Sequence, residues 1–228
     1  MTRLHRFGVF IACIAFFVPI SAAQNFARYR DFEFGMSVGS VAKQTETDVS
    51  TARTIHTLPG LVQTLQWYQR GAFSPLAAID PVRSIRFDFY DDQLFKIVAS
   101  YGTKQLEGLS ADDLIEGISS VYGPPSRPAE TVLVSAYKDY EDRQKVIARW
   151  ENAENSYSLF KTSYGNEFGL LVFSKKLDEM AVRSIRESER LDVLSAPQRE
   201  VERQEKRETD RQAQEEKARL TNKPNFRP

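Results

Sequence analysis

The chain has 228 residues, and its 31 basic side chains balance 31 acidic ones. This balance gives no electrostatic reason to expect nucleic acid as a partner. Cys13 is the one cysteine, which excludes an internal disulfide and any zinc-thiolate or iron–sulfur site built from several cysteines of the chain.

The first 23 residues have the features of a secretory signal peptide. Arg3 and Arg6 precede an apolar run from Phe7 to Ile20, and the small residues Ser21-Ala22-Ala23 follow. The run is too short to span a bilayer comfortably. We therefore expect cleavage before Gln24 and an exported protein, in the periplasm or alternatively secreted, without a transmembrane anchor after cleavage.

Cleavage would remove Cys13 and His5, leaving a cysteine-free mature chain with one histidine, His56. Phe10 to Cys13 offers an alternative, the processing box of a lipoprotein. We prefer the signal peptide, because only Phe7 to Ala12 would form the apolar core before Cys13, and the apolar residues after Cys13 belong to the same leader.

The first elements predicted in the mature chain are a helix and, after it, a hairpin. Ser37 is the expected N-cap, with Val38, Val41 and Ala42 facing inward. A threonine-rich loop, 45–61, and a strand at 64–69 follow. The alternation of Ile85, Phe87 and Phe89 then predicts a half-buried strand at 83–90. Asp91-Asp92 is the expected turn, and 94–101 the return strand.

A second unit repeats this order. Ser110 and Asp113 predict a capping box at the start of a helix that Gly123-Pro124-Pro125 ends. Four strands are predicted after it, at 131–137, 144–151, 157–164 and 167–174, with reversals at 152–155 and at Gly165-Asn166. We expect an α+β domain at 24–176, made of two similar units at about 34–103 and 108–176 that share a sheet.

Both units open on Gly-Met/Leu-Ser, at Gly35-Met36-Ser37 and Gly108-Leu109-Ser110, and antiparallel hairpins follow each helix. Together with 89–94 and the closing 121–125, this pattern resembles the tandem helix-plus-hairpin fold of beta-lactamase inhibitor protein and of the small lipoprotein of the outer-membrane barrel-assembly machine. The resemblance implies a fold and the binding of proteins, and it implies no catalytic residues.

The composition of the C-terminal segment shifts toward charged residues. Residues 177–196 carry enough apolar side chains for a helix docked on the domain. From 197 to 228 glutamate alternates with arginine and lysine, which is typical either of a solvated helix with ion pairs three or four residues apart or of a polar disordered tail. The sustained apolar heptads of a coiled coil are missing.

The chain has few signs of catalytic chemistry. His56 has no identifiable partner in the sequence. The carboxylates of the chain that could serve in acid–base catalysis lie at predicted strand ends and turns, namely Asp88, Asp91, Asp92, Glu151 and Glu154. Asp139, Glu141 and Asp142 lack the surrounding motif of a calcium loop. Neither a glycine-rich phosphate loop nor a nucleophile elbow is present.

Large aromatic and arginine side chains on the predicted strands are candidates for a partner-binding surface, because they bury much area at a small loss of entropy. They are Trp67, Tyr68, Arg86, Tyr90, Arg149 and Trp150. The alternative for each ring is a place in the core.

We therefore expect an exported, non-enzymatic protein that binds another envelope or exported protein and uses no cofactor or metal. The alternative is a small hydrolase or carbohydrate-active enzyme that uses aspartate and glutamate. Such an enzyme needs a pocket with converging carboxylates, whereas a binding protein needs an open apolar or aromatic surface.

Overall fold

The computed structural model describes residues 26–69, 80–102, 104, 106–126, 131–137, 140–162, 167–225 and 227. For residues 131–133, 135–137 and 140–143 it describes the backbone alone. The leader predicted at 1–23, together with its cleavage site and the lipoprotein alternative, lies outside these residues, as does the reversal predicted at Gly165-Asn166.

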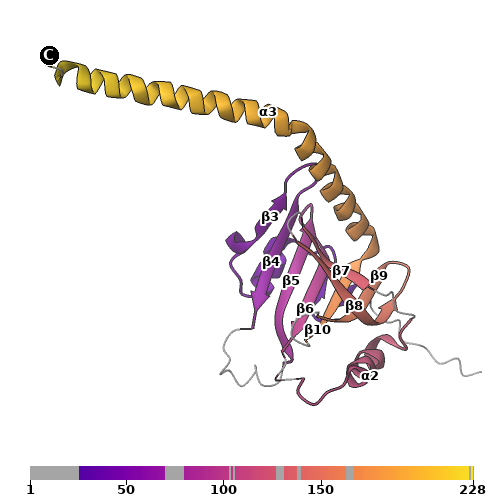
Figure 1. Cartoon of the computed structure of the whole chain (residues 1–228). Helices are drawn as coiled ribbons and strands as arrows, with labels where there is room; N and C mark the ends of the chain where they lie inside the picture. Colours follow the sequence, from indigo (N-terminus) through magenta and orange to yellow (C-terminus); the bar gives the residue numbers. More distant parts are fainter. Residues whose placement is uncertain are drawn as a thin grey trace, which may run out of the picture.

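The domain is α+β, with eight antiparallel strands in one sheet in the order β3-β4-β5-β6-β10-β9-β8-β7 (Figure 1). β6 pairs with β10 at the centre, and β3 and β7 form the edges. The strands are β3 (Arg53–His56), β4 (Val62–Tyr68), β5 (Val82–Tyr90), β6 (Gln93–Tyr101), β7 (Thr131–Tyr137), β8 (Tyr140–Glu151), β9 (Asn155–Lys161) and β10 (Phe168–Ser174); β1 (Arg28–Tyr29) and β2 (Phe32–Glu33) form a separate hairpin.

Each half of the sheet is a meander of four consecutive strands that follows one helix. α1 (Val38–Gln44) precedes β3 to β6, and α2 (Ala111–Tyr122) precedes β7 to β10. Two short 3-10 helices, η1 (Val49–Thr51) and η3 (Lys223–Asn225), lie after α1 and at the C-terminal end.

The predicted caps begin both helices. The Ser37 hydroxyl accepts a hydrogen bond from the Ser40 amide at 3.2 Å. At α2 the capping box is complete: the Asp113 amide donates to the Ser110 hydroxyl, and the Ser110 amide donates to the Asp113 carboxylate. These bonds satisfy amides that a helix leaves unpaired in its first turn, so local sequence defines where each helix begins.

The predicted β5–β6 hairpin is confirmed, and its turn also joins distant segments. Asp91 and Asp92 both have positive φ, 45° and 60°, the left-handed conformation that a tight hairpin turn requires. The Asp91 carboxylate accepts from the Leu61 amide, and the Asp92 carboxylate accepts from the Val38 amide, each at 2.9 Å. The turn therefore fixes the start of both β4 and α1.

One face of the sheet carries the main hydrophobic core. The alternating residues of β5, Ile85, Phe87 and Phe89, lie on this face and are buried. α1 packs there through Val41, and α2 contributes half-buried side chains of its apolar stripe. The largest fully buried side chains are Trp150, Tyr157, Phe87, Phe89, Leu65, Leu94, Ile97, Leu159, Leu171, Val41, Val62 and Val82.

The opposite face is more polar, and the sheet curls around it. A small apolar cluster of Val98, Val134, Phe160 and Leu171 lies there. The Arg86 guanidinium on β5 donates to the carbonyl of Val134 on β7, although four strands separate β5 from β7 in the sheet. The edge strand β7 therefore crosses in front of the middle of the sheet, as Figure 1 shows.

α3 (Lys175–Asn222) is one helix of 48 residues, about 72 Å long at 1.5 Å per residue. Its first turns lie against β5, β6 and β10, where Ala181, Ser184 and Ile185 are buried. The rest of the helix projects away from the domain (Figure 1). Within the described part of the chain, no helix is both long and apolar enough to cross a membrane.

Pro197 lies inside α3, so the docking helix expected at 177–196 and the tail expected at 197–228 belong to one helix up to Asn222. An interior proline removes one hydrogen bond and crowds the preceding turn, at a cost of about 3 kcal/mol, and helices commonly bend there. Figure 1 shows α3 bending as it leaves the domain. Arg–Glu pairs three residues apart, at 200/203, 208/211 and 216/219, support the projecting part.

The structure differs from the sequence prediction mainly in the segment 45–61. It was expected to be a loop, yet it contains η1 and the edge strand β3, whose last residue is His56. Three of the four residues of this strand are polar, namely Arg53, Thr54 and His56, so it carries little apolar pattern; an edge strand has one neighbour and needs little apolar surface. The β1–β2 hairpin was also missed, since two-residue strands carry no periodicity.

Candidate partner-binding surface

The six candidate aromatic and arginine residues are divided between the two faces of the sheet. Trp67 and Tyr68 are consecutive on β4, so they point to opposite faces. Trp67 is half-buried and packs against the main core, whereas the Tyr68 side chain is 64% exposed. Among the six candidates, Tyr68 is the one that is exposed.

Trp150 is a core residue, and its ring is unavailable to a partner. It is 1% exposed, and its indole Nε1 donates to the carbonyl of Gly123 at 2.9 Å and to the Ser119 hydroxyl at 3.3 Å. Both acceptors lie at the C-terminal end of α2. The end of α2 therefore satisfies the buried indole N–H, and these bonds attach α2 to β8.

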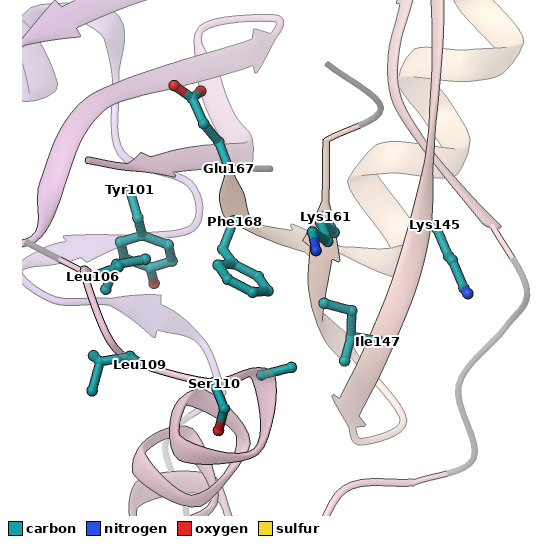
Figure 2. Close-up of a pocket in the computed structure, with 10 residues that line it drawn as sticks. Tyr101, Leu106, Leu109, Ser110, Lys145, Ile147, Lys161, Glu167 and Phe168 are labelled. Atoms are coloured by element: carbon teal, nitrogen blue, oxygen red, sulfur yellow. The ribbon is translucent and has the colours of Figure 1, made fainter. Parts of the chain in front are cut away.

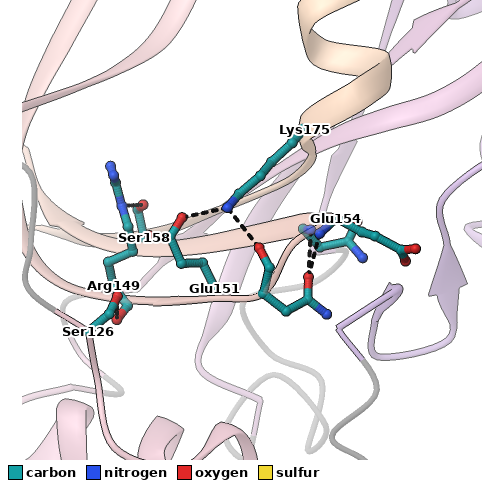
Figure 3. Close-up of polar contacts among 8 residues, drawn as sticks. Ser126, Arg149, Glu151, Glu154, Ser158 and Lys175 are labelled. Carbon is teal, nitrogen blue, oxygen red and sulfur yellow. Dashed lines mark hydrogen bonds and ion pairs between the residues drawn. The ribbon is translucent and has the colours of Figure 1, made fainter.

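Arg86 and Arg149 lie on the polar face and are held by internal contacts. Arg86 pairs with the buried Asp88 carboxylate at 3.2 Å and bonds to β7 as described. Arg149 Nε donates to the Ser158 hydroxyl at 3.2 Å, across the β8–β9 pair. Figure 3 shows Arg149 beside Ser158, on the strand that ends at Glu151. Both arginines are half-buried.

Tyr90 and His56 belong to the contact between α3 and the β3–β4 turn. A Cβ atom at Gly60 would lie 2.6 Å from the Tyr90 ring, so the turn lies directly against this ring. The Gly60 amide donates to the Ser184 hydroxyl at 3.0 Å, and Ser188 Oγ lies 3.0 Å from His56 Nδ1. Two serines on one face of α3 thus hold the turn, and His56 contributes to this docking.

The candidate carboxylates do not converge on one pocket. Asp88 pairs with Arg86, and Asp91 and Asp92 organise the β5–β6 turn. Glu151 pairs with Lys175 at 2.8 Å, and Lys175 also donates to the Asn152 carbonyl (Figure 3). Glu154 is exposed on the β8–β9 turn.

Metal ligands are the remaining sequence candidates. Asp139 and the side chains of Glu141 and Asp142 lie outside the described part of the structure. Across the described residues, no three histidine, cysteine, aspartate or glutamate side chains form a group that could hold a metal ion.

Exposed apolar side chains lie in the β3–β4 turn and on the part of α3 that follows Ser188. Leu58 lies in the β3–β4 turn, between the two residues that contact Ser184 and Ser188. Leu191 and Leu194 follow on α3, three and six residues beyond Ser188, and neighbours three apart share a helical surface. All three leucines are exposed. We call Leu58, Leu191 and Leu194 the exit patch; the sequence predicts that the apolar side chains of 177–196 dock on the domain, whereas Leu191 and Leu194 are exposed.

A second feature missed from the sequence is a cavity of about 510 Å³ at the start of α2 (Figure 2). Its apolar lining comes from Tyr101, Leu106, Leu109, Ile147 and Phe168, and Lys145, Lys161 and Glu167 lie around it. These residues come from four strands and from the segment before α2, so no local motif could have revealed the cavity.

The chain matches no protein-family model, and neither a curated protein nor a solved structure matches it.

Proposed function

We propose that this protein is an exported, non-enzymatic binding or assembly protein of the cell envelope, and that it holds another envelope or exported protein through α3 and the exit patch. The observation that carries the proposal is the division of α3 into two parts. Its first turns dock on the sheet, while the residues beyond 196 are almost all exposed and pair with one another.

The projecting part of α3 contributes little to the stability of the domain, because it buries no apolar surface on the sheet. A long solvated helix beginning beside exposed leucines is suited to reach a partner and to present an apolar anchor to it. Helices commonly bind by laying such anchors into a groove of the partner. We place the contact here rather than on the aromatic sheet face, where only Tyr68 among the candidates is exposed.

We also propose that the two halves of the domain are copies of one unit. The order of helix and four strands supports this, and so do the segments that open each half. Gly35 and Gly108 have nearly equal positive φ values, 89° and 85°, and each lies two residues before the serine that caps its helix. Tandem units of this kind are the fold that the resemblance to beta-lactamase inhibitor protein implies.

Export to the periplasm is the part of the proposal that rests on the leader sequence. Cell fractionation followed by N-terminal sequencing of the purified protein tests it. We expect the protein in the periplasmic fraction with Gln24 as its first residue. An intact N-terminus on cytoplasmic protein would contradict export, and a lipid-modified Cys13 would favour the lipoprotein alternative.

The binding role is tested by crosslinking in intact cells with a tagged protein, followed by mass spectrometry of the envelope fraction. We expect one reproducible, near-stoichiometric partner. Leu194→Ser should reduce its capture strongly, whereas Leu220→Ser is a matched control, because the two leucines are 61% and 60% exposed on the same helix. Equal loss of capture in both variants would contradict the place of the apolar anchor in the exit patch, and no partner above a tag-only sample would contradict the binding role.

A further inference from the structure

The cavity at the start of α2 has a mainly apolar lining with charged groups at its margin, and the role proposed for α3 does not use it. Its volume of about 510 Å³ falls within the range of ligand pockets, roughly 300 to 1,000 Å³. Aliphatic and aromatic side chains form its walls, as Figure 2 shows for Tyr101, Leu109, Ile147 and Phe168. Such walls favour a ligand with an apolar body.

Two lysines of like charge lie opposite each other at the margin of this cavity. Lys145 on β8 and Lys161 on β9 are directly paired in the strand register, so they share one face of the sheet. Figure 2 shows Lys161 beside Phe168 and Lys145 on the neighbouring strand, further out. The Lys161 Nζ atom lies 5.6 Å from the centre of the Phe168 ring. Like charges directly opposite each other in a sheet are unfavourable.

No carboxylate among the described side chains lies within ion-pair distance of either lysine. Glu167, the acidic residue at the cavity, is held by Arg83 through two bonds of 2.7 Å. Among the described side chains, the margin of the cavity therefore has an excess of positive charge, which an anion between the two lysines would compensate.

The other polar groups of the cavity are occupied. The first turn of α2 is closed by its own capping box, in which Ser110 and Asp113 bond to each other. Burial raises the pKa of the Tyr101 hydroxyl well above its usual value, so this hydroxyl stays uncharged. The lysines are therefore the groups that would select the charge of a ligand.

We propose that this cavity binds a small amphipathic anion, whose apolar chain or ring packs against Leu109, Ile147 and Phe168 while its carboxylate or phosphate lies between Lys145 and Lys161. The ligand class is that of medium-chain fatty acids and single-chain lipids. The ligand comes either from solution or from a membrane, and in both cases it has an anionic head on an apolar body.

The test is titration calorimetry of the full mature chain with decanoate below its micelle concentration. We expect saturable binding of one decanoate per chain. Acetate lacks the apolar body and decyltrimethylammonium carries the opposite charge, so neither should bind measurably. Flotation with phosphatidylglycerol vesicles tests the membrane source; binding to vesicles without any binding of decanoate would overturn the proposal of a cavity for single molecules.

Three variants locate the site. Lys145→Gln combined with Lys161→Gln should weaken decanoate binding by about tenfold or more, because each lysine offers a charge-assisted hydrogen bond. Leu109→Trp should block the cavity, and its thermal unfolding shows whether the fold is retained. Lys43→Gln, an exposed lysine on α1, is the control and should bind as the wild type does.

The unliganded proteins provide a second readout. Removing either charge of the opposed pair should leave the melting temperature unchanged or raise it, since repulsion is lost. Decanoate should raise the melting temperature of the wild type and of Lys43→Gln, but not that of the double lysine variant. Equal decanoate affinity in the wild type and the double variant would overturn the proposal.

Discussion

Lys96 on β6 and Asp178 on α3 form an ion pair with 2.6 Å between Nζ and Oδ1, and their side chains are only 11% and 22% exposed. The pair lies where the first turns of α3 dock on the polar face of the sheet. It therefore joins the projecting helix to the domain at a place where solvent screens charge weakly.

Asp178→Asn should destabilise the protein by roughly 1 to 3 kcal/mol, because it leaves the Lys96 ammonium without its partner in a mostly buried site. Urea unfolding measures this change. Glu179→Gln is the matched control on the next residue, where an exposed pair with Arg183 is lost, and it should change stability by less than about 0.5 kcal/mol. Equal effects of the two variants would contradict this account of α3 docking.

Trp150→Phe should lower stability by about 1 to 3 kcal/mol, since it removes the indole donor to the Gly123 carbonyl and leaves space in the core. Trp67→Phe is the comparison, because Trp67 is half-buried and should cost less. Guanidinium unfolding followed by far-UV circular dichroism measures both. A larger loss for Trp67→Phe would show that the ring at position 150 is not the main anchor of α2.

Gly60→Ala should destabilise the protein by roughly 1 to 3 kcal/mol, because the added Cβ would lie 2.6 Å from the Tyr90 ring and would push the β3–β4 turn away from Ser184. Gly39→Ala tests the same chemical change in open space on α1, where no atom lies within 4 Å of the new Cβ. It should stabilise the helix by about 0.5 to 1 kcal/mol. Thermal unfolding of both variants measures these changes in stability. An unchanged melting temperature in Gly60→Ala would contradict the close approach of the turn to the Tyr90 ring.

Acid should weaken the fold partly through Asp80. Arg30 donates two hydrogen bonds of 2.7 Å to this carboxylate and holds the pKa of Asp80 below its usual range. A carboxylate with a lowered folded pKa stabilises the fold above its unfolded pKa of about 3.9, and this contribution is lost as pH falls through the folded pKa.

Asp80→Asn should therefore reduce stability at neutral pH and make the decline of the unfolding free energy below about pH 4 less steep. Arg30→Gln should have the same effect, since it removes the donor that lowers the pKa of Asp80. Urea unfolding at a series of pH values measures this. A decline as steep as that of the wild type in both variants would show that this pair does not contribute.

The elements predicted correctly are those whose causes lie within a few residues. Ser37 and Ser110 cap helices because their hydroxyls reach amides three residues away. Asp91 and Asp92 make the turn of a hairpin whose alternation was readable in β5. The charged end of α3 was expected to be helical or disordered, and its Arg–Glu spacing is consistent with the helix observed.

The candidate site could not be predicted in the same way, because burial depends on what covers each face. Trp67 and Tyr68 have similar side chains and adjacent positions, yet the main core covers one and solvent surrounds the other. The sequence offers Trp150 as a candidate for the partner-binding surface, but its ring is buried in the core and bonded to the end of α2.

By itself the sequence determined the exclusion of a multi-cysteine site, the helix starts, the hairpin and the charged C-terminal segment, because each depends on composition or on neighbours along the chain. Only the tertiary structure decided the strand order, the docking of Ser184 and Ser188 on the β3–β4 turn, and the pairing of Lys145 with Lys161. These relationships join residues up to 132 positions apart. Strand register and packing across the whole chain determine them, and no local pattern carries that information.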